Sequence, residues 1–260
     1  MTTYLTGCVN KGALAHARRA DLGLLYTPDT RQYAKHGDTF GVRAHDNACF
    51  SQAKVFEPER WYDWLADEEP GLFATLPDVV GDHEATLARS MQYVEAVRGL
   101  GHKAAFVVQN GATVDTVPWE RFDVLFVGGV LECIPCGFTA VPGCEESSEL
   151  CRVCLERGYE RPYTTKPNLC KHCPYCDGRM TEWKLSAAAV ELIEEAQRRS
   201  MHVHVGRVNG GTRFAWCVEH GVDTCDGTYL GRGPDTNLAK LLSWLNAQYA
   251  PSEVRLALAA

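Results

Sequence analysis

Short apolar runs alternate with amphipathic stretches along most of the 260-residue chain. Most of these runs end in Gly, Asp, Asn or Gln, which is typical of buried parallel strands with polar residues at their carboxyl ends. The runs predicted to be strands are 4–7, 22–28, 39–44, 77–82, 104–111, 123–129, 202–207 and 221–227.

Amphipathic segments between the runs have helical spacing. They lie at 58–68, 83–101, 186–200 and 237–249, and the third opens with the cap residue Ser186. Strands that alternate with helices in this way predict the α/β class and a (β/α)8 barrel of the TIM type. An open doubly wound sheet is the alternative.

Residues 130–182 interrupt the alternation and have no strong strand or helix period. Without them, VLFVGG continues into TEWKLSAAAVELIEEA, which would form a strand, a loop and a helix. The chain is therefore predicted to consist of a barrel at 1–129 and 183–260 and an insertion at 130–182. The insertion would lie in a loop at the end of the barrel where active sites form.

The predicted insertion contains eight of the twelve cysteines. Three pairs have Cys-x2-Cys spacing, which lets two thiolates bind one tetrahedral zinc ion. Clustered cysteines in a cytosolic chain indicate metal more often than disulfides, and a segment with so few apolar residues needs metal to fold. The predicted zinc ligands are Cys133, Cys136, Cys144, Cys151, Cys154, Cys170, Cys173 and Cys176.

Eight thiolates can bind one or two structural Zn²⁺ ions. The ends of the insertion must meet where the barrel resumes, so Cys133, Cys136, Cys173 and Cys176 are favoured for one ion. The remaining four would bind a second ion, with His172 as a spare candidate. A site closed by four thiolates has no open position, which indicates a structural role.

The net charge of −7 argues against a protein that coats nucleic acid by bulk electrostatics. Residues 151–179 are locally basic, with six Lys or Arg against three acids. They could follow phosphates or form a solvated charged face. The absence of a long apolar run and of a signal-peptide pattern predicts a cytoplasmic protein with no membrane partner.

Acids and an amide lie at the ends of several predicted strands. They are Asp46, Asp82, Gln109 and Asp226. Each alone also fits a helix cap or a turn. Their repetition at strand ends favours one shared site at the rim of the barrel.

Five segments resemble, in the same order, motifs of the tRNA-guanine transglycosylase superfamily. They are HDNACFSQ, PDVVGD, FVVQNG, FVGG and HVGRVNGGTRFAWCVEHGVDTCDGT. The resemblance implies that Asp226 is the nucleophile that attacks C1′ of guanosine and that Asp46 is the acid/base residue. It assigns the base edge to Asp82 and Gln109, the close backbone to Gly128 and Gly129, and the covering aromatic ring to Phe50. A carboxylate is suited to trapping an oxocarbenium-like centre.

Several departures favour one branch of the superfamily. DNACFSQ lacks the glycine pair of the family's DSGGFQ, GTYLGRG replaces the PTR that follows the nucleophile, and no cysteine follows Asp226. The chain therefore resembles most the DNA-modifying, DpdA-type branch of bacteria and phages, which exchanges guanine in DNA for a 7-deazaguanine such as preQ0. This resemblance implies DNA and a small 7-deazapurine as partners, with the target nucleotide flipped out of the duplex.

Arg207, Arg213 and Arg232 lie near the predicted mouth and are candidate phosphate ligands. Two other functions remain open: a tRNA-guanine transglycosylase, and a non-catalytic zinc-ribbon module that binds nucleic acid. Asp223 remains an alternative to Asp226 if the last strand ends elsewhere. The sequence does not indicate an oligomeric state.

Overall fold

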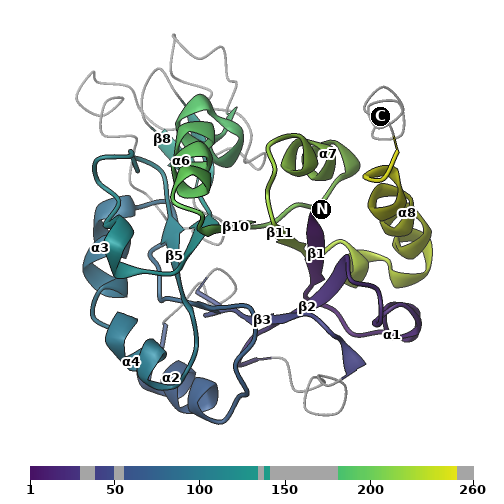
Figure 1. The fold of residues 1–260 in the computed structure, drawn as a ribbon, viewed down its shortest axis with the longest axis horizontal. Coiled ribbons are helices and arrows are strands. Elements are labelled where there is room, and N and C mark those ends of the chain that lie inside the picture. The colour runs from purple at the N-terminus through teal and green to yellow at the C-terminus, as the bar shows by residue number, and fades with distance from the viewer. Residues whose placement is uncertain (30–38, 50–55, 134–137, 141–180, 251–260) are drawn as a thin grey trace, which may run out of the picture.

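The computed structural model describes residues 1–29, 39–49, 56–133, 138–140 and 181–250. Eight parallel strands close into a barrel in the order β1-β11-β10-β6-β5-β4-β3-β2, and helices surround it (Figure 1). The barrel prediction is confirmed and the open sheet is excluded. The strands are β1 (Thr3–Thr6), β2 (Leu22–Tyr26), β3 (Arg43–His45), β4 (Ala74–Thr75), β5 (Ala104–Val108), β6 (Val124–Val127), β10 (His202–Val205) and β11 (Thr224–Gly227).

The helices form an outer ring around these strands (Figure 1). They are α1 (Lys11–Ala15), α2 (Pro58–Ala66), α3 (His83–Ser90), α4 (Val94–Gly99), α6 (Ala187–Arg198), α7 (Gly211–Glu219) and α8 (Pro234–Ala247). Ser186 caps α6 as predicted, since its Oγ accepts a hydrogen bond from the backbone N–H of Ala189. The single helix predicted at 83–101 is instead two helices, α3 and α4, with a turn between them.

The fourth strand differs from the prediction. β4 is formed by Ala74–Thr75, and residues 77–82 lie in the loop that follows it. In that loop the N–H and the C=O of Val79 both pair with the Thr86 hydroxyl of α3, at 2.9 and 3.0 Å. The side chain of Thr86 thus replaces the neighbouring strand that a β residue would need.

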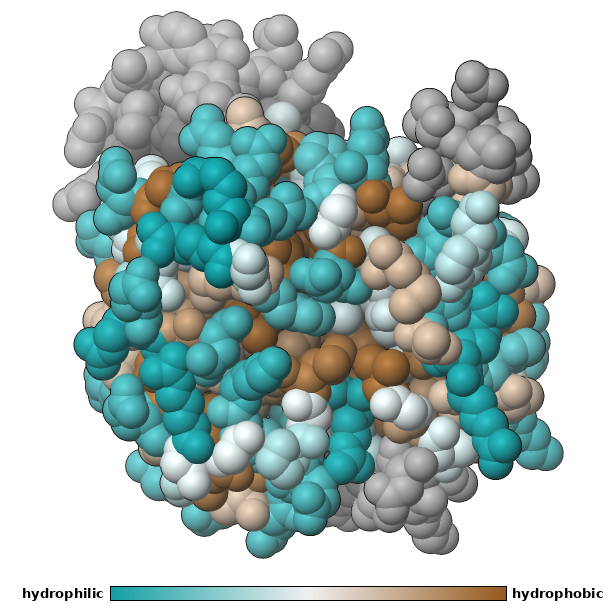
Figure 2. All heavy atoms as spheres, in the orientation of Figure 1, coloured by the Kyte–Doolittle hydropathy of each residue, from teal (hydrophilic) through white to brown (hydrophobic). Residues whose placement is uncertain are grey.

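Alternation along the strands divides the core into two layers. Inside the barrel lie Leu5, Leu25, Ala44, Phe73, Ala105, Val107, Val124 and Phe126. The intervening residues, such as Phe106 and Leu125, point outward and pack against the helices. Figure 2 shows hydrophilic residues over the outer ring of one face and hydrophobic residues toward its middle.

A small antiparallel sheet stands where the predicted insertion leaves and rejoins the barrel. It consists of β7 (Leu131–Cys133), β8 (Phe138–Ala140) and β9 (Thr181–Glu182), in the order β8-β7-β9. Leu131 pairs with Glu182 and Glu132 with Thr181, so the two ends of the segment lie together as predicted.

Gly129 shows why this junction requires a glycine. Its φ is 83°, and a Cβ placed on it would lie 2.5 Å from Cε3 of the buried Trp183 ring. Trp183 lies in the short 3₁₀ helix η4 (Trp183–Leu185) and is buried against the barrel. The junction therefore depends on a close contact between backbone and indole.

We expect Gly129→Ala to lower the free energy of unfolding by about 2–3 kcal/mol, because it adds both backbone strain and a steric clash. Gly111→Ala is the matched control. Gly111 also has a positive φ, of 90°, but a Cβ placed on it would have nothing within 4 Å. Denaturant unfolding should show a clearly larger loss for Gly129→Ala, and equal losses would exclude the indole contact as the cause.

Candidate active site

Three of the four candidate polar side chains reach one end of the barrel because all its strands are parallel, and Asp78 joins them there. Asp46 directly follows β3, Gln109 directly follows β5, and Asp226 is the third residue of β11. Asp78 follows the end of β4 by three residues. This carboxyl end of the strands is where (β/α)8 barrels place catalytic groups.

Asp226 is half-buried, and the described residues place two hydrogen-bond donors on its Oδ1 atom. His204 Nε2 lies 3.0 Å from Oδ1, and the backbone N–H of Arg207 donates to the same oxygen over 3.2 Å. Gly206 leaves room for the Phe126 ring beside Asp226, since a Cβ there would lie 2.7 Å from that ring. Asp226 is thus held firmly at one oxygen.

Asp46 is a half-buried carboxyl close to two other acids. Burial first, and then the charges of Asp226 and Asp78, raise the pKa of Asp46 to about 7. A carboxyl with a pKa near 7 can both donate and accept a proton at neutral pH. The geometry therefore suits Asp46 to acid/base chemistry beside Asp226.

Asp78 is a buried carboxylate held by two amides. Asn47 Nδ2 donates to its Oδ1 over 2.8 Å, and Gln109 Nε2 donates to its Oδ2 over 2.6 Å. Burial raises the pKa of Asp78, while the hydrogen bonds from Asn47, Cys49 and Gln109 oppose that rise. All these partners are neutral, so the carboxylate remains able to attract a further donor.

Gln109 also ties the site together. Its Oε1 accepts hydrogen bonds from the backbone N–H groups of Gly81 at 2.9 Å and Gly129 at 3.0 Å. A Cβ on Gly128 would lie 3.0 Å from the Gln109 amide nitrogen, so the backbone after β6 passes directly over this side chain. Gln109, Gly128 and Gly129 therefore form one wall of the site.

Asp82 does not join this cluster. Its exposed carboxylate accepts a hydrogen bond from the N–H of Ala85 over 2.9 Å and caps α3. The structure brings Asp78 to the place at which the sequence had suggested Asp82, because β4 ends before residue 77. Phe50 lies outside the described residues.

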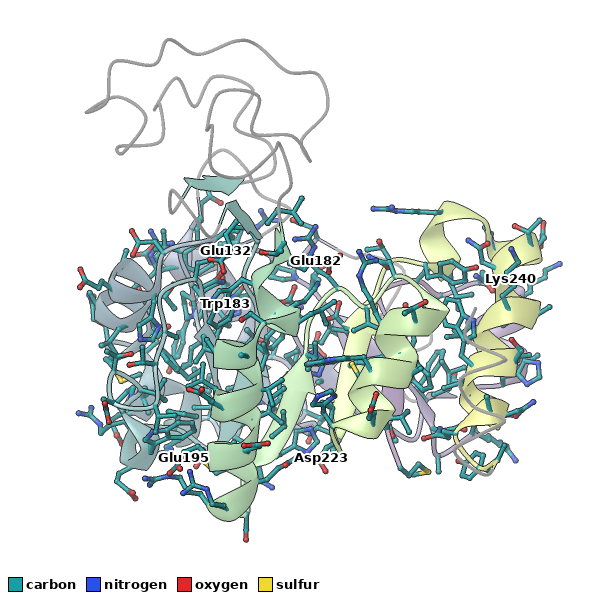
Figure 3. The ribbon with its side chains drawn as sticks, turned by 90° about the horizontal axis from the view of Figure 1, so that it is seen from above. Glu132, Glu182, Trp183, Glu195, Asp223 and Lys240 are labelled. Carbon is teal, nitrogen blue, oxygen red and sulfur yellow. The ribbon has the colours of Figure 1, made fainter. Side chains whose placement is uncertain are left out.

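Asp223 stands at the opposite end of the barrel from the site. It directly precedes β11, is exposed, and its Oδ2 accepts a hydrogen bond from the N–H of Val203 over 2.8 Å. Figure 3 shows Asp223 and Glu195 at one end of the barrel and Glu132, Glu182 and Trp183 at the other. Of these two acids, only Asp226 faces the mouth.

The three candidate arginines lie close to one another near Asp226. Burial lowers the pKa of Arg207, as do the positive charges of Arg213 and Arg232, while Asp226 and Glu182 raise it. Arg213 forms an ion pair with Glu182 of β9, and Arg232 is exposed in the 3₁₀ helix η5 (Leu230–Arg232). Three guanidinium groups thus share this side of the mouth with the acids Glu182 and Asp226.

Lys184 and His204 belong to the site although their sequence context did not mark them. The buried ammonium of Lys184 donates to the carbonyls of Gly206 at 2.9 Å and Arg207 at 3.2 Å. Burial, and then the charge of Arg207, lower the pKa of Lys184 to about 8. Lys184 therefore fastens the backbone that presents an N–H to Asp226.

The predicted zinc ligands lie outside the described residues, except that the backbone of Cys133 ends β7. Within the described ranges, no group of three or more His, Cys, Asp or Glu side chains is placed to hold a metal ion. The zinc ions therefore stay a prediction from the donor set, which suits tetrahedral thiolate coordination.

We expect metal analysis of the purified protein to find one or two zinc ions per chain. Cys173→Ser combined with Cys176→Ser should remove one ion, because two of its four ligands are lost. Cys8→Ser, in the described barrel, should retain the full content and serves as the control. Unchanged zinc in the double variant would exclude this pair as ligands.

Within the described part of the chain, no helix has the length and apolar character that crossing a bilayer requires.

Comparison with known proteins identifies no family for this chain. No protein-family model and no curated protein matches the chain. Among solved structures, ligand-free tryptophan synthase from M. tuberculosis has 12% identity and a TM-score of 0.46, covering 100% of this chain and 94% of that one. The Amycolatopsis orientalis BexX/CysO complex has 17% identity and a TM-score of 0.47, covering 99% and 89%. At these identities the likeness says nothing about activity.

Proposed function

We propose that this protein is a DNA-guanine transglycosylase, a pentosyltransferase that replaces guanine in DNA with a 7-deazaguanine base. The observation that carries the proposal is the meeting of Asp226, Asp46 and Asp78 at the carboxyl end of the barrel, with Asp46 at a pKa of about 7. One fixed carboxylate beside a carboxyl that exchanges protons at neutral pH is the pair that a retaining glycosyl transfer needs.

The first half-reaction forms a covalent enzyme–DNA intermediate. A carboxylate oxygen of Asp226 bonds to C1′ of the target nucleotide as the bond from C1′ to guanine N9 breaks. The bonding pair leaves with guanine, and protonated Asp46 supplies a proton to the departing purine. This half-reaction balances in atoms and charge and needs no external oxidant or reductant.

The second half-reaction reverses the first with a different base. N9 of the incoming 7-deazaguanine attacks C1′, the ester bond to Asp226 breaks, and Asp46 accepts the N9 proton. The sugar configuration is retained, because C1′ is inverted twice.

Asp78 is the residue we assign to the base edge, together with Gln109. A guanine-type edge presents the N1–H and N2–H donors, and the Asp78 carboxylate is buried among neutral partners that leave its charge uncompensated. The backbone of Gly128 and Gly129 lies beside the same amide, which allows a flat base to approach closely.

We expect Asp78→Asn to lower kcat/KM for the incoming base by about 10- to 100-fold, because one of the two amide donors would then face an NH₂ group. Asp82→Asn is the matched control. Asparagine caps a helix as well as aspartate does, so that variant should stay within about twofold of wild type. Base-exchange kinetics against base concentration measure both. A larger loss of kcat/KM in Asp82→Asn than in Asp78→Asn would indicate that Asp82, and not Asp78, binds the base edge.

The nucleic acid would meet the side of the mouth that carries Arg207, Arg213 and Arg232, because guanidinium groups suit phosphate contacts. Asp226 lies at the end of a closed barrel, so a duplex nucleotide would have to be flipped out to reach it. Zinc bound by the cysteines of the predicted insertion would supply structure to that segment, with no role in the bond changes.

The proposal is tested by base exchange with the purified, zinc-loaded protein. Duplex DNA with labelled guanine, and tRNA labelled in the same way, are each incubated with 7-cyano-7-deazaguanine, and label release is followed. Release from DNA is expected. Release from tRNA alone would make the protein a tRNA transglycosylase. Release from neither substrate by the folded protein would contradict base exchange and favour a non-catalytic nucleic-acid-binding module.

A further inference from the structure

A row of polar side chains runs through the barrel interior beneath Asp226. β10 and β11 are parallel neighbours, with His204 paired to Thr224 in register. In the sequence HVHV, Val203 and Val205 pack outward in the core, so His202 and His204 point inward. Thr224 and Asp226 alternate in the same way around the outward Cys225.

Three hydrogen bonds connect this row. His202 Nε2 lies 2.8 Å from Thr224 Oγ1, which lies 2.8 Å from His204 Nδ1. His204 Nε2 in turn lies 3.0 Å from Asp226 Oδ1. The fully buried His204 ring also packs on Phe126, with centroids 4.3 Å apart, and on Phe73, at 5.0 Å. Its orientation is therefore fixed at both nitrogens and by its aromatic neighbours.

The carboxylate of Asp226 gives the direction of its bond to His204. A nucleophilic carboxylate can only accept hydrogen bonds, and Oδ1 already accepts one from the N–H of Arg207, so His204 Nε2 must carry a proton and donate. The Thr224 hydroxyl has one hydrogen, so it donates to one histidine and accepts from the other. If His204 is neutral, its Nδ1 has no proton and Thr224 donates to it. If His204 is doubly protonated, Thr224 accepts from Nδ1 and donates to His202 instead.

We propose that His204 is a positioning residue that holds Oδ1 of Asp226 and leaves Oδ2 as the attacking oxygen, a role that rests on the proposed transglycosylase function. An aliphatic side chain would pack equally well between Phe73 and Phe126, whereas only a donor can hold the carboxylate. The N–H of Arg207 holds the same oxygen. Two donors on one oxygen fix the plane of the carboxylate before the sugar arrives.

The kinetic test uses two substitutions at one position. His204→Phe fills the space and removes the donor, so kcat for base exchange should fall about 10- to 100-fold with KM for DNA unchanged. His204→Gln keeps an N–H in reach of Asp226 and should recover most of that loss. His83→Phe, a buried histidine packed on Phe106 outside the barrel, should have wild-type kcat. Wild-type kcat in folded His204→Phe would overturn the proposal, as would equal losses in the Phe and Gln variants.

A spectroscopic test needs no substrate. In ¹⁵N-histidine-labelled protein, the Nε2–H proton of His204 should resonate far downfield, because its acceptor is charged. Asp226→Asn should move this resonance upfield, and Asp223→Asn should leave it in place. A resonance that keeps its chemical shift in Asp226→Asn would overturn the positioning role. If wild type exchanges no base but the resonance responds, the proposed function fails and the hydrogen bond stands.

Discussion

Asp226→Asn is expected to lower the rate of base exchange by at least about 10⁴-fold, because the amide cannot form the ester with C1′. The side chain keeps its size, and its oxygen can still accept hydrogen bonds from His204 and Arg207, so the fold should persist. The covalent protein–DNA adduct, trapped by denaturing the reaction in progress, should disappear as well.

Asp223→Asn is the control for that experiment. Asp223 lies three residues before Asp226 and is also a carboxylate, yet it faces the other end of the barrel (Figure 3). Its substitution should leave exchange within about twofold of wild type, since surface changes away from a site have small effects. Loss of activity in Asp223→Asn with Asp226→Asn active would mean that the reaction takes place elsewhere.

Asp46→Asn is expected to lower kcat/KM by about 10²- to 10⁴-fold at pH 6, the contribution typical of a general acid. In wild type, kcat/KM should fall as the pH rises through about 7, because the pKa of Asp46 is raised to about 7 and the departing purine then lacks its proton donor. The variant should lose this descending limb. A descending limb of unchanged position in Asp46→Asn would assign the proton to another group.

The same substitution should stabilise the protein at alkaline pH. The pKa of Asp46 is about 7 in the folded chain against an ordinary 3.8, so between these values the folded state binds the proton more tightly than the unfolded state. Stability therefore falls as the pH rises through this window and stays lower above it. Denaturant unfolding at pH 8 should show Asp46→Asn to be more stable by up to ~4 kcal/mol, the free energy that corresponds to a pKa of about 7 against 3.8, and at pH 4 the difference should nearly vanish.

The barrel could be predicted because its strands are buried on both faces, and such strands appear in the sequence as apolar runs. β4 was missed for a physical reason: it has only two residues, and the more conspicuous apolar pair Val79 and Val80 follows it in a loop held by Thr86. The misplaced end of this strand also changes which acid is predicted to lie in the site. A strand assumed to end at 82 points to Asp82, whereas a strand that ends at 75 places Asp78 at the mouth.

Asp46, Gln109 and Asp226 could be predicted because each follows or ends a strand that the apolar pattern marks. His204 and Lys184 could not. His204 is one of the inward positions of an alternating strand, and its local sequence does not distinguish it from the others. Its hydrogen-bond partner Thr224 is 20 residues away. Lys184 follows the cysteine-rich segment, and nothing local shows that its ammonium is buried against the carbonyl of Gly206. The alternation along β10 and β11 together places His204 beside Thr224 on the inner face, and this is the signal that indicates the histidine.

The barrel is closed by the pairing of β1 with β11, in which Leu5 lies opposite Asp226. During synthesis, β1 cannot pair with β11 until more than 200 intervening residues have been made. Contacts between residues so far apart in sequence form slowly. The strand that completes the sheet is also the strand that carries the proposed nucleophile and Thr224. A ribosome-bound chain that lacks β11 therefore has neither a closed barrel nor the proposed nucleophile, so under the proposed function the fold is completed and activity begins at the same step.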